Sequence, residues 1–173
     1  SGVETNVTMV ERDSLSYTAA NRVYQNGDYA RALTLMDNYL RQYPKGSFRI
    51  EALYALGDCS LREGNRAGAL AAFEEVGSMP MSEYKVPALQ QAAKMQVEDK
   101  HYPQAAALYK TLSTVAIKSA DIASALGGYL SAVIATGNVA EMGRAADEVL
   151  ASPYVTADLT REANFAKARA LQA

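Results

Sequence analysis

The sequence has little of what most metal, redox and nucleophilic sites require. Cys59 is its only cysteine and His101 its only histidine. A single cysteine excludes an internal disulfide framework, and a single histidine cannot build a His-rich metal site. The two residues also fall in different repeats of the pattern described below, so His101 is not placed to activate the thiol. We therefore expect Cys59 to be a buried structural residue and His101 to cap a helix or lie in an exposed turn.

Charge and hydropathy argue against two further classes of partner. The 17 Lys and Arg residues nearly balance the 19 Asp and Glu residues, the net charge is -2, and the charges are scattered along the chain. Such a pattern is a poor footprint for nucleic acid or for an anionic membrane. No apolar run approaches the roughly 20 residues that a membrane-spanning helix needs. We expect neither a nucleic-acid partner nor insertion into a membrane.

Motifs for cofactors and catalysis are also missing. The sequence contains no Gly-x-Gly-x-x-Gly and no phosphate loop, and Gly127-Gly128 lies in a helical pattern where close packing is the better interpretation. Its carboxylates follow one another along single helices beside basic residues, as on solvated helix faces. We assign no catalytic residue, no cofactor and no metal, and we expect that the protein is not an enzyme.

What the sequence does contain is a turn that recurs four times. The copies read Asn-Gly-Asp-Tyr, Glu-Gly-Asn-Arg, Asp-Lys-His-Tyr and Thr-Gly-Asn-Val, and their second residues are Gly27, Gly64, Lys100 and Gly137. These residues are 37, 36 and 37 positions apart, close to the ~34-residue period of helix-turn-helix repeats. Glycine enters the left-handed conformation cheaply, and the next Asp or Asn can cap a helix. Lys100 must form its turn without that freedom.

Small residues recur on both sides of each turn. They lie seven residues before it at Ala20, Gly57 and Ala93, and five residues after it at Ala32, Ala69 and Ala105. Small pairs allow two helix backbones to approach closely, and larger apolar residues follow at helical spacing. In the fourth copy Leu130 and Met142 replace the small pair. Proline ends second helices at Pro44, Pro80 and Pro153.

This punctuation predicts nine helices and four helical hairpins. We expect helices at about 13–26, 28–43, 47–63, 65–77, 82–99, 101–115, 119–136, 138–151 and 156–172. The hairpins are then 13–45, 47–80, 82–117 and 119–153, within a repeat region of 13–155. Residues 1–12 are expected to be a flexible segment, in which Ser1-Gly2-Val3 matches a tag remnant. Residues 156–173 are expected to be an unpaired helix, either a cap or the start of a fifth hairpin.

The stretch from Tyr24 to Ala32, followed by Tyr43-Pro44, resembles the tetratricopeptide repeat signature. The resemblance covers residues 13–151 and weakens toward the fourth copy. It implies an all-α fold, a right-handed α-solenoid of antiparallel helical hairpins. The connector 39–46 is similar to those of tetratricopeptide proteins of the Gram-negative envelope. That likeness favours the bacterial periplasm or cell envelope and leaves the cytoplasm open.

The same resemblance implies a groove lined by the first helix of each hairpin. Carried onto this sequence, the groove residues are Tyr17, Asn21, Tyr24, Gln25, Tyr54, Asp58, Arg62, Gln90, Lys94 and Glu98. Tyrosine and arginine are common at interfaces, and Asn or Gln can bond an extended backbone. The protein is therefore expected to be an interaction scaffold that binds a peptide or partner domain on the concave face. The alternative is a structural or self-assembling spacer of a longer repeat protein, with no groove ligand.

The last helix adds one more expectation about partners. Leu159, Phe165, Ala168 and Leu171 are expected to cover the fourth hairpin. The alanines at 163, 166, 170 and 173 leave the rest of the helix surface small and weakly polar, which favours the start of a fifth hairpin in a longer chain over a cap. An exposed apolar strip invites a second copy to pack against it. A weak homodimer through the C-terminal helix is therefore expected beside the protein or peptide partner.

Overall fold

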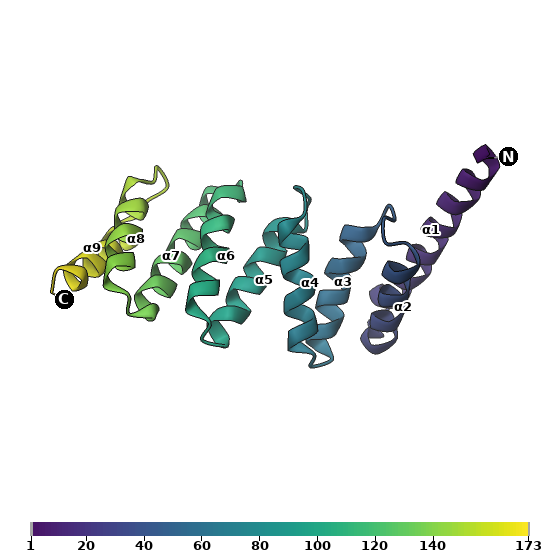
Figure 1. Cartoon of the computed structure of the whole chain (residues 1–173), viewed down its shortest axis with the longest axis horizontal. Helices are drawn as coiled ribbons and strands as arrows, with labels where there is room; N and C mark the ends of the chain where they lie inside the picture. The colour runs from purple at the N-terminus through teal and green to yellow at the C-terminus, as the bar shows by residue number, and fades with distance from the viewer. Residues whose placement is uncertain (1, 173) are drawn as a thin grey trace. The chain divides into compact units, whose positions relative to one another are not determined.

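In a computed structural model, residues 2–172 are described, with side chains from residue 8 onward. Over that range the chain forms nine α-helices and no strand (Figure 1), which confirms the all-α expectation. The helices are α1 (Gly2–Gln25), α2 (Tyr29–Gln42), α3 (Arg49–Arg62), α4 (Arg66–Ser78), α5 (Lys85–Glu98), α6 (Tyr102–Val115), α7 (Ser119–Thr136), α8 (Val139–Ala151) and α9 (Ala157–Gln172). The bounds of α2 to α9 lie within three residues of those expected.

The first helix begins earlier than the sequence suggested. The segment 1–12, expected to be flexible, is helical from Gly2 onward, while the expected tag remnant at Ser1 lies outside the described residues. No proline or glycine interrupts residues 3–25, so nothing in the sequence stops the helix there. Asp13, the expected first residue of this helix, lies inside α1 with only 7% of its surface exposed. Its carboxylate serves a tertiary contact described below.

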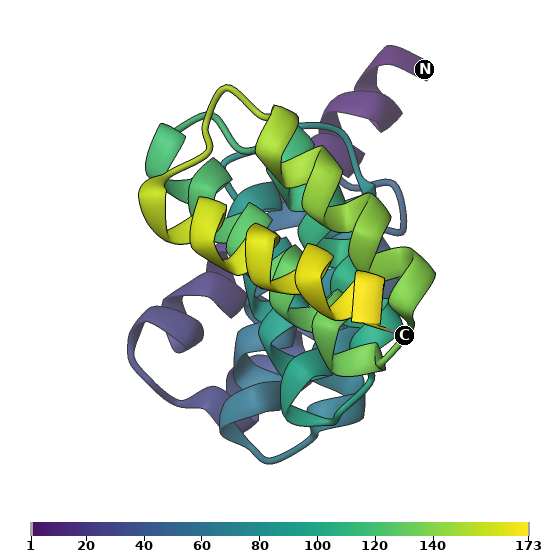
Figure 2. The ribbon, with the colours of Figure 1, turned by 90° about the vertical axis from the view of Figure 1, so that its left-hand side faces the viewer.

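The chain divides into two compact units, Ser1–Ala88 and Leu89–Ala173, and each is described by itself. In the first unit α1 packs on α2, α2 on α3, and α3 on α4. In the second unit α6 packs on α7 and α7 on α8, while α9 lies against α8 and also reaches α7 (Figure 2). Within each unit, these helices pack on their neighbours along the chain.

The four turns have the backbone geometry that their residues indicate. Gly27, Gly64 and Gly137 have φ angles of 81°, 84° and 73°. Lys100 takes the same place with a φ of 60°, and no other described non-glycine residue has a positive φ. A left-handed backbone costs a residue with a Cβ roughly 1 to 2 kcal/mol. The third turn therefore forms against a conformational penalty that the other three avoid.

Helix caps follow the same turns. The side chains of Asp28, Asn65 and Asn138 each accept a hydrogen bond from a backbone amide three residues later. His101 occupies the corresponding position before α6 but makes no side-chain cap. Its exposed ring instead lies with Nδ1 2.9 Å from Gln96 Oε1, which ties the turn back to α5. Of the two roles expected for His101, the exposed turn is the one observed.

Close approach of helices depends on glycine at two places. A Cβ on Gly57 would lie 2.8 Å from Cε1 of Phe73, where α3 meets α4. A Cβ on Gly128 would lie 2.6 Å from Cε1 of Tyr109, where α7 meets α6. Both distances are shorter than carbon atoms tolerate. Gly128 of α7 therefore serves packing, as expected from its helical setting, whereas a Cβ on Gly127 would make only an ordinary contact, 3.5 Å from Leu159 Cδ2.

Candidate functional site

A polar and aromatic cluster joins the first two hairpins at their turn ends. We call Tyr24, Tyr29, Asp58 and Arg62 the turn cluster. Tyr24, near the end of α1, donates a hydrogen bond from its hydroxyl to Asp58 Oδ2 at 2.5 Å. Asp58 lies one helical turn before Arg62 on α3, and the Arg62 Nε donates to Asp58 Oδ1 at 3.1 Å. The guanidinium carbon of Arg62 lies 4.3 Å from the centre of the Tyr29 ring.

The turn cluster is partly open to solvent. The Arg62 side chain is 52% exposed, whereas that of Asp58 is 24% exposed. Burial, followed by the hydrogen bond to Asp58, raises the pKa of Tyr24 above its ordinary value. The phenol is therefore a proton donor at neutral pH. Stacking on a ring and bonding to a carboxylate hold the guanidinium in one place while much of it still faces water.

Tyr54 lies beside this cluster in an aromatic setting. Its ring centre is 5.6 Å from that of Phe73 and 5.0 Å from that of Tyr84. Burial and the nearby Asp58 charge raise the pKa of the Tyr54 phenol. Asn21 and Gln25, also expected in the groove, lie one turn apart on α1, and their side-chain amides are 3.5 Å apart.

Tyr17 has a different setting from that expected of a groove residue. Its ring stacks on Phe48 with centres 4.4 Å apart and planes inclined by 4°, and it is 5.8 Å from the ring of Tyr39. Tyr39 donates from its hydroxyl to Asp13, and Asp13 also accepts from the Ser47 amide at 2.8 Å. These contacts fasten the connector between α2 and α3 to α1. Much of the Tyr17 side chain therefore serves packing.

The remaining groove candidates, Gln90, Lys94 and Glu98, are exposed residues of α5 in the second unit. They recur every four residues and so share one face of that helix. The structure thus brings Tyr24, Asp58 and Arg62 together directly. It places Tyr54, Asn21 and Gln25 on the same two first helices, and it leaves the α5 residues as a separate set.

Sequence reasoning missed Tyr29 as a member of the turn cluster. Its place after the Gly-Asp turn is usually a core position in such repeats, which indicates packing. In the structure it is half-buried, and its ring supports Arg62 from the next hairpin. Tyr29 lies two residues after Gly27 of the first turn, and Arg62 lies two residues before Gly64 of the second turn. Because both lie next to a turn, the sequence could have indicated that they meet at the turn ends of neighbouring hairpins.

Neither the Cys59 thiol nor any described group of possible metal ligands is in a setting that favours chemistry. Cys59 is fully buried, and burial, followed by the Asp58 charge, raises the pKa of its thiol to about 11. It therefore stays protonated and poorly nucleophilic at neutral pH. Among the residues that the structure describes, no three His, Cys, Asp or Glu side chains gather in a way that could hold a metal ion.

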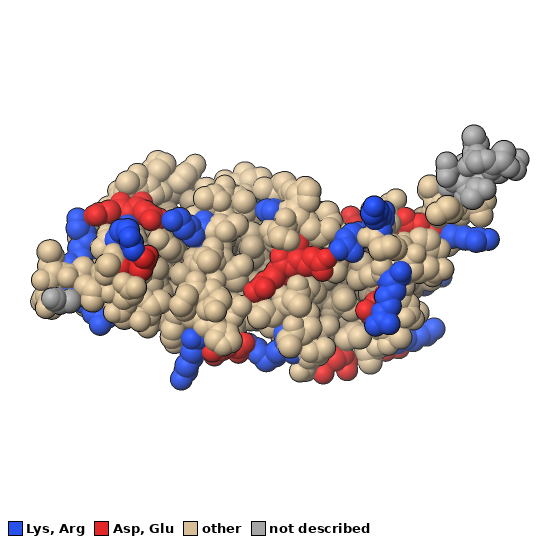
Figure 3. All heavy atoms as spheres, viewed as in Figure 1, with Lys and Arg blue, Asp and Glu red and all other residues tan. Residues whose placement is uncertain are grey.

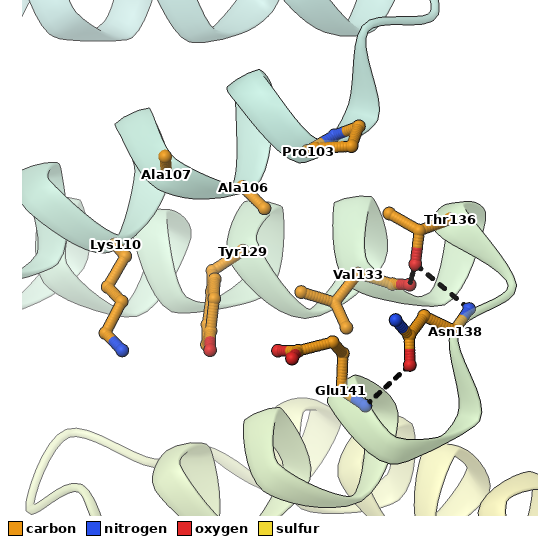
Figure 4. A pocket seen from close by; sticks show the side chains of 9 residues that line it. All are labelled: Pro103, Ala106, Ala107, Lys110, Tyr129, Val133, Thr136, Asn138 and Glu141. Atoms are coloured by element: carbon orange, nitrogen blue, oxygen red, sulfur yellow. Dashed lines mark hydrogen bonds between the residues drawn. The ribbon is translucent and has the colours of Figure 1, made fainter.

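A pocket of about 320 Å³ opens between α6, α7 and α8 in the second unit (Figure 4). Lys110, Tyr129 and Glu141 point toward it beside apolar residues. Lys110 lies 3.3 Å from Glu148, however, and Glu141 is paired with Arg144. The charges at its rim are thus matched within the protein, and no reactive group is left aimed into it.

On the face shown in Figure 3, basic and acidic side chains are interspersed. Within the described part of the chain, no helix combines the length and the apolar character that crossing a membrane requires.

Comparison with known proteins finds a family match in the first two hairpins. The tetratricopeptide repeat family model matches residues 13–46 and 51–78. No curated protein is similar enough to count as a match.

Solved structures share the fold across more of the chain. A tetratricopeptide repeat protein from Parabacteroides merdae is 18% identical over 92% of this chain, with a TM-score of 0.60, and the match spans only 59% of that protein. Nearly identical TPR-like repeats ascribed to a Podosopora anserina kinesin light chain are 16% identical over 94% of this chain and 91% of theirs, with a TM-score of 0.53. The MamA RS-1 ArsTM double mutant is 16% identical over 92% of this chain and 93% of its own, with a TM-score of 0.56.

At these identities the solved structures establish the fold alone. That fold is the all-α, TPR-like solenoid class expected from the sequence. Proteins built from such repeats generally mediate protein–protein interaction and are generally non-catalytic scaffolds. Residues 13–46 and 51–78 thus match the tetratricopeptide repeat family, and the nine helices within residues 2–172 have the TPR-like fold.

Proposed function

We propose that the protein is an interaction scaffold whose first unit binds a peptide or partner domain along α1 and α3. The observation that carries the proposal is the turn cluster, in which a half-exposed Arg62 is held between Asp58 and the ring of Tyr29. A side chain that is already positioned loses less conformational entropy on binding. Arginine and tyrosine are also the residue types that most often dominate binding energy.

The chemistry of this surface favours an extended peptide with a carbonyl or carboxylate opposite Arg62. The Nε of Arg62 is engaged with Asp58, and a guanidinium has further N–H donors arranged as a planar fork. The side-chain amides of Asn21 and Gln25 on α1 can bond a peptide backbone, and the Tyr54 ring offers flat apolar area. Gln90, Lys94 and Glu98 on α5 are proposed as a second set of contacts on the other unit.

The alternative function, a structural spacer, is favoured by one feature of the same residues. Asp58 accepts hydrogen bonds from both Tyr24 and Arg62, so the cluster connects the first hairpin to the second. Such a connection would be useful even with an idle groove. The groove function and the spacer function predict different partner affinities when the exposed Arg62 side chain is changed and the more buried residues of the turn cluster are left intact.

Arg62→Gln makes that distinction, and the chain offers a matched control. Arg41 on the second helix α2 also pairs with an aspartate four residues earlier, Asp37, at 3.0 Å, and its side chain is 79% exposed. Partners are captured from the native source with the parent chain and identified. Their affinities for purified Arg62→Gln and Arg41→Gln variants are then measured by calorimetry.

A groove function predicts that Arg62→Gln weakens binding by tenfold or more, whereas Arg41→Gln changes it less than twofold. Both variants should keep the parent circular dichroism spectrum. Equal affinities for the two variants would exclude Arg62 from the binding surface. If Tyr54→Ala then also left affinity unchanged, the spacer interpretation would replace the groove function.

A further inference from the structure

The helices α1 and α3 keep one register where they pack against each other. Asp13 of α1 accepts a hydrogen bond from the Ser47 amide, just before α3, and the two residues are 34 positions apart. Tyr24, about three turns further along α1, bonds to Asp58 of α3, again 34 positions away. Residues of α1 that lie between Asp13 and Tyr24 therefore face the residues 34 positions later in the chain.

One pair between these two contacts is Tyr17 and Glu51, which are also 34 positions apart. Burial, followed by the Glu51 charge, raises the pKa of the Tyr17 phenol, so the carboxylate lies near this ring. Asp13 and Asp58 each accept two hydrogen bonds. The half-buried Glu51, in contrast, makes no hydrogen bond and no ion pair with any residue that the structure describes. A carboxylate that has lost part of its water is thus left without a partner.

Aromatic rings surround this carboxylate. Tyr54 follows Glu51 by three positions in α3 and so shares its face of the helix. The ring of Tyr84, just before α5, has its centre 5.0 Å from that of Tyr54. Burial, followed by a hydrogen bond to Glu83, raises the pKa of Tyr84, and the nearby Tyr17 and Glu51 act in the same direction. We call the half-buried residues Tyr17, Glu51, Tyr54 and Tyr84 the Glu51 site.

The described neighbours of the Glu51 site give it a negative potential. Every charged or ionisable neighbour that acts on Tyr17 and Tyr84 raises the pKa of these phenols, as an acidic group does. Arg49 lies two positions before Glu51 and so points to another side of α3, where it pairs with Glu75. Tyrosine rings add electron-rich faces, which attract cations. The chemistry of the site therefore suits a cation.

We propose that the Glu51 site receives an arginine side chain of the partner peptide. This inference rests on the proposed groove function, because it names the chemistry of the peptide that the groove binds. A planar guanidinium can lie against a tyrosine ring while its N–H groups bond to the Glu51 carboxylate. A lysine ammonium brings a point charge without that planar fit. A neutral or acidic side chain would leave the carboxylate unpaired in the complex.

The helix α3 also sets the spacing of charges in the peptide. Glu51 and Arg62 are eleven positions apart on this helix, which corresponds to about 16 Å along its axis. An extended peptide covers about 3.3 Å per residue. A peptide that places an acidic group opposite Arg62 therefore carries its arginine about five residues from that group. The motif is an arginine and an acidic residue separated by about four others.

Selection from a library of random peptides tests the motif. The peptides are displayed on phage and are about twelve residues long, enough to span both charges in either order. The parent, Glu51→Gln and Arg62→Gln are used as baits in parallel. We expect the parent to enrich peptides with an arginine about five residues from an aspartate or glutamate. Glu51→Gln should lose the preference for arginine and keep that for the acid, and Arg62→Gln should do the reverse.

Calorimetry with one enriched peptide then measures the contact itself. Glu51→Gln should weaken binding by roughly tenfold or more. Replacing the arginine of the peptide by citrulline, its neutral isostere, should weaken binding to the parent equally and cause no further loss with Glu51→Gln. Tyr84→Leu, which removes a ring, should weaken binding by roughly threefold or more. Tyr84→Phe, which keeps the ring, should restore most of that loss.

Asp121→Asn is the matched control. Asp121 is also an acidic residue in the first turn of a first helix, α7, and it belongs to the other unit. Such residues stabilise their helix through its dipole, so both Glu51→Gln and Asp121→Asn lose that effect. Asp121→Asn should change the peptide affinity by less than about twofold. Circular dichroism spectra like that of the parent would show that each variant is folded.

The outcomes separate this inference from the groove function. Enriched peptides that depend on Arg62 but carry no arginine, or that bind Glu51→Gln as tightly as the parent, would overturn the arginine site and leave the groove function standing. Lysine or citrulline in place of arginine without loss of affinity would also overturn it. Peptides that need Glu51 and their arginine but not Arg62 would support the Glu51 site and remove Arg62 from the groove. If the parent enriches no peptide over the two variants, both proposals fail.

Discussion

Gly57 lies so close to the ring of Phe73 that a Cβ on residue 57 would come within 2.8 Å of Cε1. The contact joins the two helices of hairpin 2 and explains why a residue of low helix propensity occupies the middle of α3. Gly143, in the middle of α8, has no such neighbour, because the nearest atom, the Ala170 Cβ, would be 3.9 Å away. The two glycines therefore provide a matched pair.

Gly57→Leu should lower the free energy of unfolding by about 1 to 3 kcal/mol, because the added side chain overpacks the contact with Phe73. Gly143→Ala should raise it by about 0.5 to 1 kcal/mol, because alanine favours the helix and meets no clash. Urea titrations followed by circular dichroism measure both changes. A Gly57→Leu variant as stable as the parent would show that the helices separate without cost.

Lys100→Gly should stabilise the protein. Lys100 holds a φ of 60° in the third turn, where the other turns use glycine. Relieving the left-handed strain is worth roughly 1 to 2 kcal/mol, and the greater freedom of glycine in the unfolded chain offsets part of this gain. We expect a net increase of about 0.5 to 1 kcal/mol in urea titration. Gly64→Lys, the reverse change, should be destabilising, and two changes of the same sign would contradict the explanation.

Tyr39→Phe should lower the free energy of unfolding by about 1 to 3 kcal/mol, the cost of leaving a buried polar group with an unmade hydrogen bond. The hydroxyl of Tyr39 donates to the buried Asp13 and accepts from the Phe48 amide at 3.1 Å. Tyr154→Phe is the control, because Tyr154 is 43% exposed and its change should stay within about 0.5 kcal/mol. Equal effects of the two substitutions in thermal unfolding would argue against the network.

Alkaline pH should destabilise the fold. Burial raises the pKa of Tyr84 and Tyr129 to about 12 and that of Cys59 to about 11, from ordinary values of 10.0 and 9.0. Between the ordinary and the raised values, the unfolded chain has lost protons that the folded chain keeps. The unfolded state then binds fewer protons, so the free energy of unfolding falls as pH rises through that window. Below about pH 8 these groups are protonated in both states and contribute no slope.

The measurement is a series of urea midpoints across that range. We expect a level region below about pH 8, a decline that begins as the unfolded Cys59 thiol ionises near pH 9, and a steeper decline once the tyrosines ionise in the unfolded chain, up to about pH 12. Tyr129→Phe should make the decline shallower, because one of the raised groups is then absent. A decline that is identical in the parent and the variant would assign the effect to other groups.

The sequence predicted the features that depend on local chemistry. Gly27, Gly64 and Gly137 indicated left-handed turns, and the repeat period predicted the same conformation at Lys100. Gly57 predicted a close contact between two helices. All three expectations are confirmed. These features depend on backbone conformation and side-chain volume, which a residue type largely determines. The repeat then transferred them from one hairpin to the next.

Features that depend on contacts between distant residues were not predictable in the same way. The role of Asp13 depends on Tyr39 and Ser47, which only the fold brings to it. Likewise the groove position of Tyr17 did not reveal its stacking on Phe48. The groove residues themselves remain a proposal, since a partner decides which surface is used.

The Asp13 network has a mechanical consequence. Its carboxylate is bonded both to Tyr39 on α2 and to the Ser47 amide just before α3. A pulling force applied at the start of α1 therefore reaches the entrance of the second hairpin through a side chain, without passing along α2. Together with the Tyr24–Asp58 hydrogen bond, this strap links hairpin 1 to hairpin 2 through side chains. Under load we therefore expect these two hairpins to unfold together.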